Sequence, residues 1–179
     1  MIDTNWLVKT NINIDGFTDT INDITKDETP DNIFNKSTRG NKSVQFDLIN
    51  HFKKIQYITN KITKEFESIE VLQKKKFKPL MGWTVYGHQG GYHKVHNHVG
   101  QHGKLDHISV VLYLETPNSK GWQQRGQFYF FLLDENGIKY HEIEPEKGMM
   151  IIMPTKVMHG SYPQPRGLRH TLNFDFGVA

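Results

Sequence analysis

Short apolar runs alternate with clusters of turn-forming residues through the second half of the chain. After Pro79 the runs are WTVYG, GYHKVHNH, HISVVLYLE, GQFYFFLLD, KYHEIEP, MMIIMP and RHTLNFDF. Segments such as TPNSKG, DENG and YPQPRG separate them and are rich in residues that favour turns. Many short strands with no helix between them predict an all-β core, either a sandwich, a jelly roll or a barrel.

A different period precedes this region, over residues 43–77. Apolar side chains are spaced there by three and four residues, which predicts a helix with one apolar face. The positions are Leu48, Ile49, Phe52, Ile55, Ile62, Phe66 and Ile69. Ser43 is the expected N-cap and Pro79 the expected end, with one break near Thr59 and Asn60.

The remaining N-terminal residues carry weaker signals. Residues 19–42 are polar and turn-rich, which predicts a long loop, and only the first dozen residues suggest a strand. We therefore expect one domain over 1–179. Residues 1–79 supply loop and helical support, with one or two helices, and residues 80–179 form the β core.

Composition limits the chemistry available to this domain. The chain has 179 residues, enough for one domain with a substantial core, and 36% of them are hydrophobic. It has no cysteine, so any transition metal must be held by His, Asp or Glu, and the ten histidines become candidate ligands.

Charge and hydropathy weigh against some partners. The net charge is only +3, and we interpret the densest basic run, Lys74–Lys76 with Lys78, as a solvated helix end, so nucleic acid is not an expected partner. No apolar run is long enough for a membrane span, and the N-terminus lacks a signal-peptide pattern. These features predict a cytoplasmic protein.

The strongest chemical motif is His96-Asn97-His98, in a predicted strand. Side chains two apart share one face of a strand, so the two imidazoles are spaced to bind one metal. A third ligand is offered by His159, which follows the apolar run from Gly148 to Pro154. Alone, either motif is common in proteins, and only the combination points to a metal centre.

Ten residues beyond His159, Arg169 opens a run that alternates between polar and apolar residues. The polar positions are Arg169, Thr171, Asn173 and Asp175. An arginine inside a barrel is costly unless it meets a carboxylate, and its planar guanidinium can bind one through two hydrogen bonds. The pattern indicates an acidic ligand near the predicted metal.

Together, H-x-H, the distal histidine after a G-x5-P strand and the arginine ten residues later resemble the 2-oxoglutarate and Fe(II)-dependent oxygenases. The likeness covers Trp83 to Phe176 and is strongest to the prolyl-hydroxylase-like, small bacterial and phage-type members. It implies a double-stranded β-helix (jelly roll), with His96 and His159 on iron and Arg169 on the far carboxylate of 2-oxoglutarate. By the same resemblance Tyr86 and Tyr113 lie near the co-substrate, and Thr171 on the arginine's face joins that site.

The resemblance implies an activity that uses Fe(II), 2-oxoglutarate and O2. Such an enzyme hydroxylates an organic substrate while 2-oxoglutarate becomes succinate and CO2. A peptidyl proline is the first expectation for the substrate, by resemblance only, and another protein residue or a small metabolite would also suit the site.

This sequence departs from the family pattern at His98, where an Asp or Glu is usual. A neutral imidazole leaves the iron centre one unit more positive. Three arrangements remain open: His98 is the third ligand, which we favour because imidazole suits iron, Asp106 replaces it, or water or halide fills the place.

Two other classes of function compete with the oxygenase. Gly90, five residues and H-x-H also fit the first motif of a cupin, which would act as a 2-oxoglutarate-independent dioxygenase or metal-dependent isomerase. However, residues 99–103 lack the glutamate of that motif. The other competitor is a non-enzymatic β-sandwich that binds a partner, with the histidines degenerate.

Overall fold

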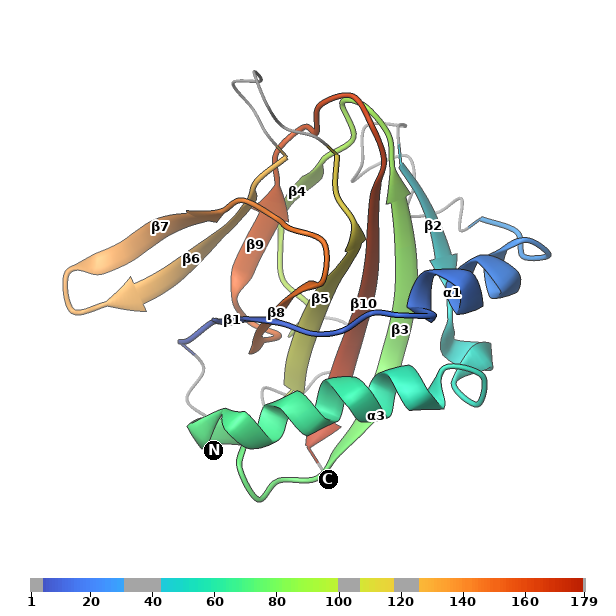
Figure 1. The fold of residues 1–179 in the computed structure, drawn as a ribbon. Coiled ribbons are helices and arrows are strands. Elements are labelled where there is room, and N and C mark those ends of the chain that lie inside the picture. The colour runs from blue at the N-terminus through green and yellow to red at the C-terminus, as the bar shows by residue number, and fades with distance from the viewer. Residues whose placement is uncertain (1–4, 31–42, 100–106, 118–125, 179) are drawn as a thin grey trace.

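Two antiparallel sheets build the protein, whose computed structural model describes residues 5–30, 43–99, 107–117 and 126–178 (Figure 1). In spatial order, the larger sheet contains β1 (Val8–Asn11), β8 (Met149–Pro154), β5 (His107–Glu115), β10 (Arg169–Val178), β3 (Phe77–Gly87) and β2 (Ser43–Asp47). The smaller sheet contains β4 (His93–His96), β9 (Met158–Ser161), β6 (Phe128–Asp134) and β7 (Gly137–Ile143).

Helices cover one face of the larger sheet. These are α1 (Phe17–Thr25) and α3 (Gln56–Glu65), with the 3-10 turns η1 (Ile49–His51), η2 (Phe66–Ser68) and η3 (Glu70–Leu72). Ile21, Ile58 and Ile62 are fully buried in one cluster with residues of β5, β8 and β10. No helix in the described part of the chain is long and apolar enough to cross a membrane.

Strand β10 lies between β3 and β5 and is buried on both faces. Leu172, Phe174 and Phe176 point into the helix-covered cluster. The alternate positions therefore point to the opposite face, toward the smaller sheet. A second apolar cluster on that side includes Tyr113 and Phe128. The protein thus has an outer core under the helices and an inner core between the sheets.

The helix predicted for residues 43–77 is wrong at both ends. Ser43 begins β2 rather than capping a helix, because residues 43–47 alternate in burial and pair with β3. Pro79 lies inside β3, beside the irregularity where the register shifts between Asp175 and Phe176, a position at which a strand tolerates a residue without N–H. The α-helix is confined to α3, which local periodicity could not separate from the flanking turns.

The loop predicted for residues 19–42 is also wrong in its first part. Residues through Thr25 belong to α1, whose Phe17, Ile21 and Ile24 are buried at helical spacing, a signal already visible in the sequence. Residues 26–30 form turns and irregular backbone, as predicted, and residues 31–42 lie outside the described part of the chain. The N-terminal strand is confirmed as β1, and it joins the larger sheet beside β8.

The strands predicted after Pro79 are confirmed, and β5 and β8 have the predicted bounds. The short strand β9, which carries His159, was not predicted as a strand. It pairs with β4 on one side and β6 on the other, so its strand conformation depends on hydrogen bonds to segments that are distant in the sequence.

His170 is a buried histidine on the outer face of β10. Its Nε2 lies 2.8 Å from Thr84 Oγ1, and its ring stacks on Tyr86 with centroids 4.1 Å apart. Burial lowers the pKa of His170 to about 4. Below its ordinary pKa the unfolded chain therefore takes up a proton that the folded protein does not.

We predict that His170 makes the protein less stable as the pH falls from 7 to 5. The loss from this residue is about 2 kcal/mol, because the folded pKa lies below the unfolded one. Urea unfolding of the wild type and of His170→Asn at both pH values measures it, and the variant should lose correspondingly less. An equal loss in both proteins would contradict the role of His170.

Candidate functional site

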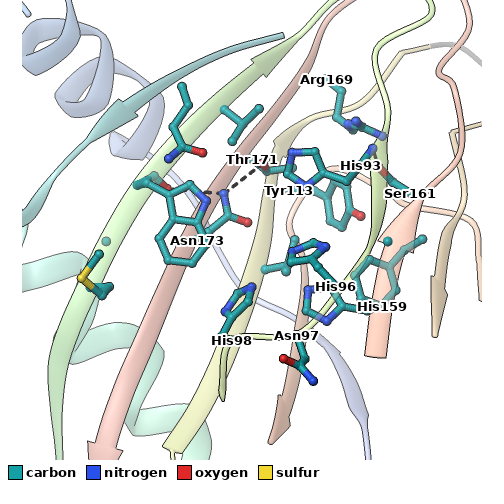
Figure 2. Close-up of a pocket in the computed structure, with 18 of the residues that line it drawn as sticks. His93, His96, Asn97, His98, Tyr113, His159, Ser161, Arg169, Thr171 and Asn173 are labelled. Atoms are coloured by element: carbon teal, nitrogen blue, oxygen red, sulfur yellow. Dashed lines mark hydrogen bonds between the residues drawn. The ribbon is translucent and has the colours of Figure 1, made fainter. Parts of the chain in front are cut away.

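A cavity of about 270 Å³ lies between the two sheets (Figure 2). Residues of β10 that face away from the helices line it, together with residues of β3 and β5 from the larger sheet and β4 and β9 from the smaller one. Its volume is close to the lower end of the range typical of pockets for small ligands. Arg169, Thr171 and Asn173, three polar positions of the alternating run, therefore line this cavity.

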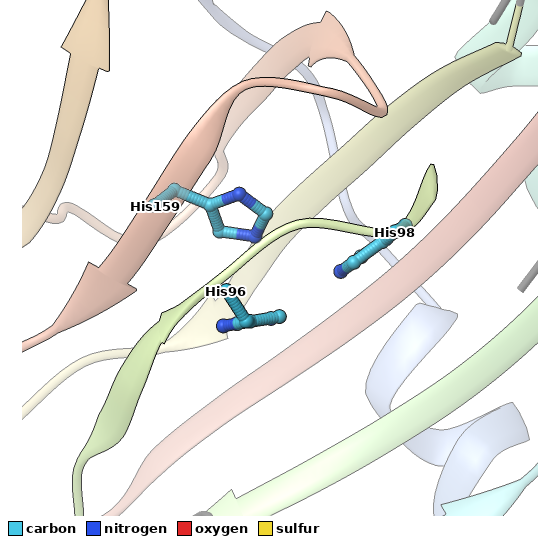
Figure 3. Close-up of side chains that lie close together, drawn as sticks. All are labelled: His96, His98 and His159. Carbon is cyan, nitrogen blue, oxygen red and sulfur yellow. The ribbon is translucent and has the colours of Figure 1, made fainter. Parts of the chain in front are cut away.

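Three of the histidines that line the cavity come together (Figure 3). His96 ends β4 and is the register partner of His159 in β9, while His98 follows β4 by two residues. The backbone N–H of His98 donates to the carbonyl of Thr155 at 2.9 Å, which holds this segment beside β8. One nitrogen from each ring lies within 4.8 Å of the others, close enough to hold one metal ion.

Each of the three rings has its Nδ1 held by an oxygen. His96 donates to the carbonyl of Lys94 and His159 to that of Val157, each at 2.8 Å. His98 Nδ1 lies 2.8 Å from Asp175 Oδ1. An imidazole whose Nδ1–H donates in this way presents the Nε2 lone pair to a metal.

The protonation state of His159 also favours metal binding. Burial holds the pKa of His159 well below its ordinary value, and the nearby His98 and His96 lower this pKa further. A neutral imidazole is the form that binds metal. The ring also stacks against Phe128 at 5.5 Å between centroids, which fixes its orientation.

Arg169 lies at another side of the cavity and is only 4% exposed. Its Nη1 is buried and has no hydrogen-bond partner among the described residues. Burial lowers the pKa of this guanidinium, although Tyr113 raises it, and an arginine stays charged throughout. A buried cation that its described surroundings leave partly unsatisfied is costly, so the arrangement favours an anionic ligand at this end.

Tyr113 and Thr171 accompany Arg169 in the lining of the cavity. They are register partners on β5 and β10, which puts both side chains on the cavity face. Burial raises the pKa of Tyr113 to about 12, and Arg169 acts in the opposite direction. The phenol therefore stays protonated and can donate a hydrogen bond.

Tyr86, expected at the same site by resemblance, lies on the opposite face of the sheet. Its hydroxyl donates to Asn22 Oδ1 at 2.8 Å and lies 3.1 Å from Thr25 Oγ1, beside α1. Its neighbour Val85 faces the cavity instead. Successive side chains of a strand point to opposite faces, so Tyr86 and Val85 cannot both face the cavity. The sequence alone did not show which alternate residues of β3 face inward.

Three further residues lie at the site although the sequence analysis did not assign them to it. Asp175 belongs to the same alternating run as Arg169, and its contact with His98 depends on the tertiary fold. Gln45 lines the cavity from β2, in a segment that was expected to be helix. Trp83 lines it from β3, which was predicted as a strand. Asp106, the alternative ligand, lies outside the described residues.

Comparison with known proteins supports the fold. No protein-family model and no curated protein matches the sequence. Among solved structures, a prolyl-4-hydroxylase from Pseudomonas putida is 19% identical, with a TM-score of 0.66 over 99% of this chain and 95% of that one. The fold is that of the 2-oxoglutarate and Fe(II) oxygenases.

Two further structures agree with this. A viral collagen prolyl hydroxylase from Paramecium bursaria Chlorella virus-1 is 17% identical, with a TM-score of 0.65 over 99% of both chains. An oxygenase of the 2-oxoglutarate–Fe(II) family from Burkholderia pseudomallei is 10% identical, with a TM-score of 0.69 over 96% of this chain and 84% of that one. The predicted double-stranded β-helix, or jelly roll, is confirmed.

We predict that Arg169→Met stabilises the ligand-free protein by about 2 kcal/mol, because replacing an unpaired buried charge by an apolar side chain of similar length removes a desolvation cost. Urea unfolding in metal-free buffer without carboxylic acids measures the change. Arg166→Met is the matched control, since Arg166 is exposed, and its effect should stay within about 0.5 kcal/mol. A destabilised Arg169→Met would show that the guanidinium is already compensated.

Proposed function

We propose that this protein is an Fe(II)- and 2-oxoglutarate-dependent oxygenase that hydroxylates an organic substrate. His96, His98 and His159 hold the iron, and Arg169 holds the far carboxylate of 2-oxoglutarate, assisted by Tyr113 and Thr171. One observation carries the proposal: Arg169, whose buried Nη1 has no hydrogen-bond partner among the described residues, lines the same cavity as three converging imidazoles.

The donor set fits the proposed ligands. Imidazole nitrogen is a suitable ligand for iron, and three ligands on one side leave positions for a chelating acid and O2. The planar guanidinium of Arg169 can bind a carboxylate through two hydrogen bonds, and the protonated phenol of Tyr113 can donate a third. The solved structures with this fold include one from Streptomyces hygroscopicus with nickel and 2-oxoglutarate bound.

The chain's own residues position the reactants and keep water out. When bound, Fe(II) and 2-oxoglutarate supply the oxidation, in which O2 delivers one oxygen atom to the substrate and 2-oxoglutarate becomes succinate and CO2. Arg169 and the histidines, held at two sides of one cavity, set the direction in which 2-oxoglutarate lies. The apolar inner core, including Tyr113, Phe128 and Ile151, limits the access of water.

The competing functions receive less support from the site. A cupin that does not use 2-oxoglutarate gives no role to the buried charge of Arg169. A binding module with a degenerate site gives no reason for three imidazoles to converge within 4.8 Å. We therefore favour the oxygenase over both.

We predict a visible charge-transfer band when metal-free protein receives Fe(II) and then 2-oxoglutarate under anaerobic conditions. Arg169→Gln should raise the Kd for 2-oxoglutarate about 100-fold, because losing one partner of a buried charge pair costs on the order of 3 kcal/mol. His159→Ala should greatly weaken iron binding and remove the band. Anaerobic titration followed by absorption measures both effects.

Arg166→Gln is the control for this titration, since it removes an exposed arginine from the segment just before β10. It should leave the Kd for 2-oxoglutarate unchanged. Stoichiometric iron binding with no band in the wild type would favour the cupin, and the absence of iron binding would leave the binding module.

We further propose a peptidyl proline as the substrate. Three of the solved structures that share this fold are described as prolyl hydroxylases, one of them with a peptide fragment of hypoxia inducible factor. Trp83 lines the cavity four residues along β3 from Gly87, the register partner of Arg169, and its ring lies 5.4 Å from that of His98. An indole beside the metal site suits an apolar proline ring.

A proline-rich peptide such as (Pro-Pro-Gly)5 should gain 16 Da per oxygen added, with one succinate formed per oxygen. Trp83→Ala should lower kcat/KM for the peptide about 10-fold, because truncating a contacting aromatic costs on the order of 1–3 kcal/mol. Mass spectrometry follows the product. The same peptide with alanine for proline is the control, and equal oxidation of both would exclude proline as the target.

A further inference from the structure

Asp175 is a fully buried carboxylate that contacts the histidine cluster. Its exposed fraction is 0%, and its Oδ1 accepts a hydrogen bond from Ser109 Oγ at 2.6 Å and lies 2.8 Å from His98 Nδ1. Ser109 Oγ lies 3.0 Å from the same nitrogen. A carboxylate oxygen accepts, so His98 is the donor, and its Nδ1 carries the proton.

The sheet itself places these groups. Asp175 and Ser109 are register partners on the adjacent strands β10 and β5, so their side chains lie next to each other on one face. His98 reaches them from the segment after β4, which the hydrogen bond to Thr155 holds in place. The contact therefore joins both sheets and is built from buried parts of the fold.

The three imidazoles differ in what their Nδ1 atoms meet. His96 and His159 donate to neutral backbone carbonyls, whereas His98 donates to a carboxylate. A carboxylate partner fixes the tautomer and the orientation of an imidazole and makes its other nitrogen a stronger ligand. Asp175 thus contacts His98, the histidine at the position where the resembled family usually has a metal-binding Asp or Glu.

From this geometry we infer that His98 and Asp175 act as one unit that replaces the usual metal-binding carboxylate. Asp175 is a positioning residue that holds His98 with Nε2 toward the metal. It also supplies, behind the imidazole, the negative charge that a metal-binding carboxylate in the motif would carry. The inference rests on the proposed function, because it takes His98 as a ligand of the iron. It therefore assigns the third ligand position to His98 rather than to Asp106, water or halide.

The unit predicts that aspartate is a poor replacement for His98 while Asp175 is present. In His98→Asp the new carboxylate would face Asp175 inside the fold, and two close buried carboxylates cannot both be ionised at low cost. The double variant His98→Asp/Asp175→Asn removes that conflict. It should therefore bind Fe(II) more tightly than His98→Asp alone.

The test measures Fe(II) binding by anaerobic calorimetry for the wild type, Asp175→Asn, His98→Ala and the double variant of these two. Asp175→Asn should bind Fe(II) about 10- to 100-fold more weakly, as expected for a lost partner of a metal-binding histidine. In the His98→Ala background the same change should have no further effect. Asp134→Asn, at an exposed carboxylate on β6, is the matched control and should bind as the wild type does.

A spectroscopic readout separates this role from simple support of the fold. With 2-oxoglutarate bound, Asp175→Asn should move the charge-transfer band to shorter wavelength, because the iron loses electron density. A lower melting temperature with unchanged Fe(II) affinity and band would overturn the inference, as would additive effects of the two substitutions. Absence of Fe(II) and 2-oxoglutarate binding in the wild type would instead overturn the proposed function.

A second measurement needs no variant and covers the case in which Asp175→Asn fails to fold. In Zn(II)-loaded wild type, nitrogen–proton NMR should show His98 protonated on Nδ1, with this proton further downfield than the Nδ1 protons of His96 and His159. A metal bound through Nδ1 of His98, or three equivalent protons, would overturn the unit.

Discussion

Side-chain alternation along β10 is the constraint on which the rest of the structure depends. The strand lies between β3 and β5, and both of its faces are buried, one under the helices and the other toward the smaller sheet. Leu172, Phe174 and Phe176 belong to the core under the helices, and the intervening polar residues point the other way. One strand therefore builds the core and the cavity at once, and a shift of one residue in its register would exchange them.

Burying polar groups on one face of β10 is costly, and the fold compensates them unequally. Asp175 is satisfied by Ser109 and His98, both supplied by neighbouring segments. Arg169 keeps a buried Nη1 without a partner among the described residues. The charge of Asp175 is therefore compensated within the fold, whereas the charge of Arg169 is the one that we propose a ligand completes.

The substitution of histidine for a carboxylate in H-x-H has a physical explanation within the same framework. Metal binding needs both suitable donor atoms and a balance of charge, and these need not come from one residue. In the unit that we infer, the imidazole of His98 would supply the donor atom and the carboxylate of Asp175 behind it would supply the charge. Such a division depends on a rigid, dry environment, which β5 and β10 provide by pairing Ser109 with Asp175.

The sequence by itself determined the all-β core, most of its strands, and the candidate residues His96, His98, His159 and Arg169. These features depend on local alternation and on spacing, which a chain displays before it folds. Helix boundaries were predicted less well, since residues 43–47 directly precede the helical spacing that starts at Leu48 but pair with β3. Only a long-range contact separates the two.

Tertiary structure alone decided which side of each strand faces the cavity. It put Tyr113 beside Arg169, sent Tyr86 to the helix side, and joined Asp175 to His98 across 77 positions of sequence. Local pattern shows that two faces differ but not which partner strand or register each will meet. That choice is made when the two sheets close on each other and bury both faces of β10.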